Sequence, residues 1–239
     1  MRVIVTRPEL SGRRTARRLE ELGHTPVLLP LSRPVHDPLA AEQGLRRPHS
    51  AVAVTSAEAV RAIQLLGSAL EPYLDSTVFS VGKATSHAAH DSGFRTIVTS
   101  GGNGADLADR IDEHFRQAGP ATDPLLYIAG EPRAPLFEKR LDEHGIVHDT
   151  VCAYRMAEIE YGLQHLSTEL AGADAVLFYS RETVERFFRL PIFADGLDPV
   201  RHGIFLCLSP NVAAAVPAEL QVGTVVATSP EEEGLLDLL

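Results

Sequence analysis

Small hydroxyl, amide and glycine residues recur where short apolar runs of the sequence end and stretches of helical length begin. The N-terminus of a helix offers free backbone N–H groups and the positive end of a dipole, and both favour anions. Hydroxyl and guanidinium groups beside such a terminus add further donors. The set predicts a cleft for a ligand with several carboxylates or phosphates, and its members are Arg7, Thr55, Ser56, Thr85, Gly102, Asn103, Gly130, Arg133, Ser180 and Ser209.

Each of these positions, taken alone, has a simpler interpretation. Serine, threonine and asparagine are preferred at the N-cap of a helix, where the side chain accepts a hydrogen bond from the first turn. Capping explains any single hydroxyl of the set at least as well as ligand binding does. The prediction of a binding site therefore depends on the whole set.

The sequence lacks the motifs of several common sites. No G-x-x-x-x-G-K-[ST] is present, and SGGNGAD at 100–106 does not have the spacing of G-x-G-x-x-G. His87 and His90 lie three residues apart, but no H-E-x-x-H or C-x-x-C accompanies them, so no metal site is expected. The G-x-S-x-G turn of a serine hydrolase is also missing.

The elements that would position these residues alternate between strand and helix. Short apolar runs rich in β-branched residues, such as 51–54, 78–81 and 175–179, are typical of buried parallel strands. Between the runs lie stretches of helical length, such as 57–66 and 106–117. The alternation predicts an α/β protein with parallel sheets flanked by helices.

The two halves of the chain resemble each other in order, which indicates an internal duplication that produced two similar domains. The matching pairs of segments are VIVTRP at 3–8 with LYIAGEP at 126–132, AVAVTS at 51–56 with AVLFYS at 175–180, VFSVGKAT at 78–85 with IFLCLSPNV at 204–212, and TIVTS at 96–100 with TVVATS at 224–229.

Composition excludes some classes of protein. The 239 residues carry a formal net charge of −10, which disfavours binding to nucleic acid. No apolar run reaches the roughly 18 residues of a membrane-spanning helix, and the N-terminus has no apolar core of a secretory signal. Cys152 and Cys207 cannot form a disulfide framework. We therefore expect a cytoplasmic protein without membrane contact.

Several fragments, in this order, resemble the uroporphyrinogen-III synthase family. Each fragment is weak by itself, but together they extend over almost the whole chain. They are VTRP at 5–8, VTSAEAV at 54–60, SVGKAT at 80–85, GNGADLA at 102–108, YIAGEPRAPLFEKRLDEHGI at 127–146, TVCAYR at 150–155, FYS at 178–180 and LSPNVAAAV at 208–216.

The resemblance implies two α/β domains joined by a two-stranded β ladder, with a cleft between the domains. One domain would be discontinuous and would consist of residues 1–30 and 158–239. Residues 37–148 would form the second domain, and 31–36 and 149–157 would be the linking strands. This arrangement agrees with the duplication, because each domain would contain the first strand–helix unit of the opposite half.

The resemblance also implies a reaction. The family acts on hydroxymethylbilane, a linear tetrapyrrole, and closes it with loss of water to uroporphyrinogen III, in which ring D is inverted. The steps pass through an azafulvene cation and a spiro intermediate, and no metal or organic cofactor takes part. The enzyme would be a hydro-lyase of heme biosynthesis, and we expect it to be a monomer.

Two residues carry this chemistry over to the chain. Tyr154 in TVCAYR matches a tyrosine that faces the cleft in the family, and a neutral phenol there can protonate the departing hydroxyl. Thr85 matches a threonine of the cleft. Tyr179, Glu58 and the Ser209 turn depart from the family pattern. A binding or sensing protein for an anionic small molecule is the alternative, and it would need no proton donor at Tyr154.

Overall fold

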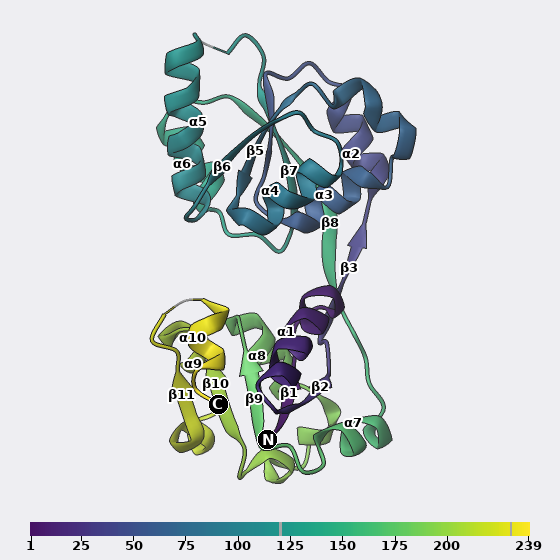
Figure 1. The fold of residues 1–239 in the computed structure, drawn as a ribbon, viewed down its shortest axis with the longest axis vertical. Helices are drawn as coiled ribbons and strands as arrows, with labels where there is room; N and C mark the ends of the chain where they lie inside the picture. The colour runs from purple at the N-terminus through teal and green to yellow at the C-terminus, as the bar shows by residue number, and fades with distance from the viewer. Residues whose placement is uncertain (120, 230) are drawn as a thin grey trace. The chain divides into compact units, whose positions relative to one another are not determined.

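The computed structural model describes residues 1–119, 121–229 and 231–239, and Figure 1 shows its helices and strands. The chain divides into two compact units. Unit 1 consists of Met1–Arg33 and Ala157–Leu239, and unit 2 consists of Pro34–Met156. The chain leaves unit 1 along β3 (Ser32–His36) and returns to it along β8 (His148–Glu158). Unit 1 is therefore discontinuous in sequence, whereas unit 2 is continuous.

Unit 1 is built on a five-stranded parallel sheet with the strand order β11-β10-β9-β1-β2. Its strands are β1 (Arg2–Val5), β2 (Thr25–Leu28), β9 (Ala175–Phe178), β10 (Ile204–Cys207) and β11 (Thr224–Val226). Its helices are α1 (Glu9–Glu21), α7 (Leu163–Leu170), α8 (Arg181–Phe188), α9 (Pro210–Ala213) and α10 (Glu232–Leu236), with short 3₁₀ helices at Pro191–Phe193, Asp198–Val200 and Ala218–Gly223.

Both faces of this sheet are buried. Successive residues of a strand point to opposite faces of the sheet, and on the central strands both sets of side chains pack in apolar clusters. Val3 and Val5 pack in one cluster with Leu19 of α1. Ile4, between them, packs in another cluster with Phe187 of α8. The central strands are therefore apolar on both faces, as the short continuous runs predicted.

Unit 2 is built on a six-stranded sheet with the order β3-β8-β7-β4-β5-β6. Its other strands are β4 (Ala51–Val54), β5 (Thr77–Val81), β6 (Thr96–Ser100) and β7 (Leu125–Glu131). Its helices are α2 (Pro38–Leu45), α3 (Ala57–Gln64), α4 (Gly82–Asp91), α5 (Gly104–Ala118) and α6 (Leu136–Glu143), with a 3₁₀ helix at Gly67–Tyr73.

The strands of unit 2 from β8 to β6 are parallel. At the edge, β3 runs against β8, because the N–H of Asp37 donates to the carbonyl of Ala153 (2.7 Å) and the N–H of Ile159 donates to that of Leu31 (3.2 Å). Residue numbers rise along one strand where they fall along the other, so β3 and β8 are antiparallel. The prediction of parallel sheets flanked by helices is confirmed, with β3 as an antiparallel edge strand.

The strand orders agree with the internal duplication. Reading β11-β10-β9-β1-β2 in unit 1 against β6-β5-β4-β7-β8 in unit 2 pairs the segments that the repeat matched: β1 with β7, β4 with β9, β5 with β10 and β6 with β11. Each unit therefore uses the first strand–helix–strand segment of the opposite half of the chain. No helix in the described part of the chain has the length and apolar character needed to cross a membrane.

Candidate active site

Each sheet has one point at which the strand connections reverse direction, and several of the predicted site residues lie there. In unit 2 this point lies between β4 and β7, and in unit 1 it lies between β1 and β9. Open parallel sheets bind their ligands outside the carboxyl ends of the strands at such a point. In unit 2, Thr55 and Ser56 follow β4, Gly130 lies near the end of β7, and Arg133 follows it.

A β-bulge places Tyr154 across this edge. The register of β7 and β8 pairs Ala129 with Cys152 but Gly130 with Tyr154, so Ala153 is an extra residue on β8. Bulges bend a strand and redirect the side chains beside them. Here the Tyr154 ring lies directly on Gly130, and a Cβ atom built on that glycine would overlap the Cζ and Cε1 atoms of the ring. Gly130 is thus a position of close approach.

Tyr154 lines a cavity of about 350 Å³ within unit 2. Strand β3 contributes Val35 and His36 to its wall, and β7 and β8 contribute most of the remainder. The full lining is Val35, His36, Asp37, Pro38, Leu39, Glu131, Cys152, Tyr154 and Arg155. Of the predicted site residues, only Tyr154 is among these, and Thr85 is buried in the first turn of α4.

The surroundings of Tyr154 favour the neutral phenol. Burial raises the pKa of Tyr154 above its ordinary value of 10, and the charge of Glu58 acts in the same direction. A hydrogen bond with the side chain of Ser56 opposes these effects in part. The hydroxyl therefore carries its proton throughout the neutral range and is able to donate it.

Three residues beside Tyr154 were not predicted as site residues. The His36 ring lies 6.3 Å from the Tyr154 ring, centroid to centroid, and its Nε2 is 3.0 Å from Oε2 of Glu58. The other carboxylate oxygen of Glu58 accepts a hydrogen bond from Arg61. The sequence marks Glu58 only as a departure from the family pattern, and a single histidine on a strand gives no signal in the sequence.

Thr55 has a partner inside unit 2. Its hydroxyl lies 2.9 Å from the hydroxyl of Tyr127, a buried residue of β7 whose ring packs edge-on against Phe137. Burial raises the pKa of Tyr127, although the hydrogen bond with Thr55 opposes this. The position of Thr55 at the strand end is therefore set by a contact with the core.

The loop before α5 already contains an internal anion. Asn103 is the N-cap residue, and the Asp106 carboxylate accepts from its backbone N–H at 2.7 Å. A Cβ on Gly102 would overlap this carboxylate, which explains why glycine is needed there. Asp106 thus occupies one of the N–H groups that the loop offers to a ligand.

Arg133 is also engaged within unit 2. Its Nε and Nη2 atoms donate to the two carboxylate oxygens of Glu138 at 2.9 and 3.1 Å, and Thr150 donates to the same carboxylate. The hydrogen bond from Arg133 is the main cause that lowers the pKa of Glu138. A ligand carboxylate at Arg133 would have to share or replace Glu138.

The strand ends of unit 1 contain a compact charged network. Nη1 of Arg7 donates to Glu232 of α10 at 2.7 Å, and its guanidinium carbon lies 4.1 Å from the centre of the Tyr179 ring. Thr15 and the Tyr179 hydroxyl donate to the same Glu232 oxygen, at 2.5 and 2.9 Å, and Arg18 pairs with the other. Arg7 is therefore held by a carboxylate from the C-terminal helix.

This network makes the stability of unit 1 dependent on Glu232. Burial alone would raise the pKa of Glu232, but hydrogen bonds from Thr15 and Tyr179 and the charges of Arg7 and Arg18 bring it below the ordinary 4.5. A lowered pKa stabilises the folded state above the ordinary value, and this stabilisation is lost as the pH falls through the folded-state pKa.

Glu232→Gln is expected to lower the free energy of unfolding by about 1–3 kcal/mol at pH 7, because charged hydrogen bonds are weakened and Arg7 loses its partner. Urea titrations from pH 7 to pH 3 should show the difference from wild type shrinking below pH 4.5. Glu233→Gln is the control, since that side chain is 63% exposed and pairs only with Arg18 in the network. Equal effects of the two substitutions would contradict the role of Glu232.

The remaining predicted hydroxyls serve as helix caps. Ser56 accepts from the N–H of Glu58 at 3.1 Å, Ser180 from that of Thr183 at 3.2 Å, and Ser209 from that of Val212 at 3.4 Å. The capping interpretation is thus correct for all three. Whether they also contact a ligand stays a prediction.

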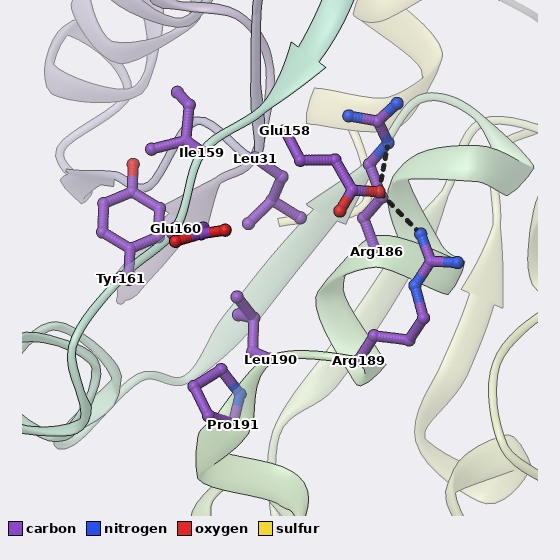
Figure 2. A pocket seen from close by; sticks show the side chains of 9 residues that line it. All are labelled: Leu31, Glu158, Ile159, Glu160, Tyr161, Arg186, Arg189, Leu190 and Pro191. Atoms are coloured by element: carbon purple, nitrogen blue, oxygen red, sulfur yellow. Dashed lines mark hydrogen bonds and ion pairs between the residues drawn. The ribbon is translucent and has the colours of Figure 1, made fainter.

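A second cavity, of about 260 Å³, lies within unit 1 (Figure 2). The Glu158 carboxylate accepts from Arg189 at 2.8 Å and lies 3.7 Å from Nε of Arg186, whose Nη2 donates to Glu182. The remainder of the wall includes Leu31 and Leu190. Both cations already have carboxylate partners, and Glu160 adds another negative charge. This cavity is therefore a poor site for a polyanion.

Comparisons with known proteins agree with each other. The family model described as uroporphyrinogen-III synthase HemD matches residues 13–237. The chain is 25% identical to the uroporphyrinogen-III synthase of Saccharomyces cerevisiae over 199 residues, which cover 75% of this chain and 72% of that protein.

Two solved structures share the fold. One is uroporphyrinogen-III synthetase from Helicobacter pylori 26695, with a TM-score of 0.63 and 16% identity over 100% of this chain and 98% of that chain. The other is a mutant uroporphyrinogen III synthase from the extremely thermophilic bacterium Thermus thermophilus, with a TM-score of 0.56 and 18% identity over 99% of this chain and 96% of that chain. At these identities the structures support the fold.

Proposed function

The chain belongs to the uroporphyrinogen-III synthase family and is thus an enzyme of heme biosynthesis that acts on a tetrapyrrole, and we propose that it is a hydro-lyase. Its substrate would be hydroxymethylbilane, which it closes with inversion of ring D and loss of water. The observation that carries the proposal is the family match over residues 13–237. The alternative of a binding or sensing protein without catalysis is not favoured.

Tyr154 is the proposed acid for the first step. The hydroxyl of ring A leaves as water only after it gains a proton, and the remaining azafulvene cation is the electrophile. The position of Tyr154 on the wall of a cavity supports this role, and its raised pKa means that the phenol carries its proton at neutral pH. Its partner Ser56 and the glycine beneath it, Gly130, set the position of the phenol.

The proposed carboxylate contacts are donors at the strand ends. Helix N-termini and hydroxyls at these ends are suited to a polyanion. The main task of the site is to fold a flexible ligand so that one carbon meets the substituted position of ring D. The proposed contacts are Arg7, Thr55, Ser56, Thr85, Gly102, Asn103, Gly130, Arg133, Ser180 and Ser209.

Hydroxymethylbilane provides the direct test. The linear substrate closes spontaneously to the type I isomer, so enzyme activity appears as the type III isomer. We expect purified protein to give mainly type III, with no metal or cofactor added, when the products are oxidised and separated by chromatography. A folded protein that leaves only type I would overturn the proposed function.

The finer properties of the protein are also proposals. We propose that the protein is a monomer and that it acts in the cytoplasm. We also propose that it binds neither nucleic acid nor membrane, because the net charge of −10 disfavours binding to nucleic acid and to anionic lipid surfaces. Light scattering coupled to gel filtration tests the monomer: a mass well above 25.9 kDa would contradict it.

A further inference from the structure

His36 is a titratable side chain of the cavity that the proposed mechanism does not use. It is the last residue of β3, it lines the cavity with Tyr154, and its side chain is 19% exposed. The two rings are tilted at 49° with their centroids 6.3 Å apart. A ligand atom in this cavity can therefore approach both rings.

Glu58 determines which nitrogen of His36 exchanges protons. Nε2 is 3.0 Å from Oε2 of Glu58, so Nε2 carries a proton in both charge states of the ring and donates it to the carboxylate. Nδ1 is left to accept or release the second proton. Arg61 donates to the other oxygen of Glu58 and keeps the carboxylate from rotating. An acid–base group oriented by a carboxylate in this way is a common arrangement in enzymes.

The reaction needs a group that accepts a proton. Hydroxymethylbilane loses hydroxide together with one added proton, and the product pyrroles are neutral. The substituted ring D carbon that is attacked first carries no hydrogen, so the proton is lost later: after the spiro intermediate opens, the unsubstituted ring D carbon forms the final bond to close the ring and must then lose its proton. Tyr154 supplies the first proton and becomes a phenolate, which must be protonated again before the next turnover.

On the basis of the proposed function, we propose that His36 is a catalytic residue that accepts the proton lost from ring D at Nδ1. The C–H bond breaks, its electron pair restores the aromatic pyrrole, and the imidazole becomes an imidazolium held by Glu58. The imidazolium then returns the proton to Tyr154, so that the cycle releases only water and the closed product. Substrate and product differ by that one water, and no oxidant or reductant is needed.

Charged and titratable side chains either contact His36 or line the cavity with it. Glu58 and Arg61 approach from α3, Glu131 from β7, and Asp37 follows His36 in the chain; the lining from β8 adds Cys152, Tyr154 and Arg155. A base acts in its neutral form, so protonation of His36 would abolish its role. A rate that depends on the neutral form of this base should therefore fall towards acid pH.

The test compares wild type with His36→Gln on hydroxymethylbilane from pH 5 to 9. We expect kcat to fall by about 100-fold, the lower limit of positioned acid–base catalysis, with a much smaller change in KM. The decline of kcat towards acid pH should disappear in His36→Gln. Glu58→Gln, which keeps the hydrogen-bond acceptor without its charge, should retain the acid decline and lose less activity.

Three controls separate the possible outcomes. His87→Gln alters an exposed histidine of α4 and should match wild type. Melting temperatures of each variant show whether a loss of rate reflects unfolding, and Glu58→Gln serves as the second variant if His36→Gln does not fold. If wild type makes only type I, the proposed function fails. If wild type makes type III and His36→Gln keeps its rate and pH profile, or if the wild-type rate falls towards alkaline pH instead, His36 is not the base.

Discussion

Gly130→Ala is expected to inactivate the protein almost completely, although only one methyl group is added. The new Cβ would overlap the Cζ and Cε1 atoms of Tyr154. A small shift of the Tyr154 side chain cannot relieve this overlap, because the ring itself occupies the position of the Cβ. Either the ring leaves the cavity wall or β7 and β8 separate at the bulge. Overpacking of this kind costs about 1–3 kcal/mol, and the proposed acid moves away from the substrate.

Two measurements check the result. The rate of type III formation should fall to that of a variant without the phenol, about 100-fold or more below wild type, and the urea midpoint should decrease. Gly101→Ala is the matched control, because a Cβ at that position meets nothing within 4 Å. Wild-type activity in Gly130→Ala would show that the Tyr154 ring does not have to lie on Gly130 during catalysis.

Tyr154→Phe removes the proposed proton donor and leaves the ring. Positioned acids contribute about 100- to 10,000-fold, and because the ring A hydroxyl leaves readily we expect a decrease at the lower end of this range, about 100-fold. The melting temperature should fall only slightly, because the substitution removes a single hydrogen bond, the one with the side chain of Ser56. Because the pKa of Tyr154 is raised, its loss should lower the rate equally at pH 7 and pH 9.

Tyr161→Phe is the control for this substitution. The Tyr161 hydroxyl donates to the carbonyl of Pro30 at 2.8 Å within unit 1, so its loss should lower stability and leave the rate unchanged. An unchanged rate in Tyr154→Phe would mean that Tyr154 contributes only packing and does not act as the acid. A large loss of stability would mean that the hydrogen bond between Tyr154 and Ser56 is required for folding.

The sequence predicted the sheets well because buried parallel strands leave a strong local pattern. Runs such as 51–54 and 175–179 became β4 and β9, and the repeat predicted which strands correspond. The edge strand β3 was less evident, because Ser32–His36 contains a proline and alternates only weakly. The predicted domain boundaries at 30, 37, 148 and 158 stay a prediction, since neither unit has been shown to fold alone.

The site was harder to predict, because its contacts depend on strand register and distant pairing. The bulge at Ala153, which brings Tyr154 onto Gly130, has no marker in the sequence. Residues 36 and 58 meet only after β3 has joined the sheet edge and α3 has packed in unit 2, and Arg7 meets Glu232 across nearly the whole chain. The predicted roles of the other strand-end residues also stay predictions.

The strand order has a consequence for the synthesis of the chain on the ribosome. Strand β1 pairs with β2 and β9, and β9 begins only at Ala175. The first 33 residues, which contain β1 and β2, therefore emerge long before β9, the second partner strand of β1. Strands β4 to β7 of unit 2 are synthesised in between. Pairings of such long sequence separation form slowly, because a large loop must close first. The N-terminal segment thus spends much of translation with an apolar strand unpaired on one edge, a state that exposes nascent chains to aggregation and makes them substrates for chaperones.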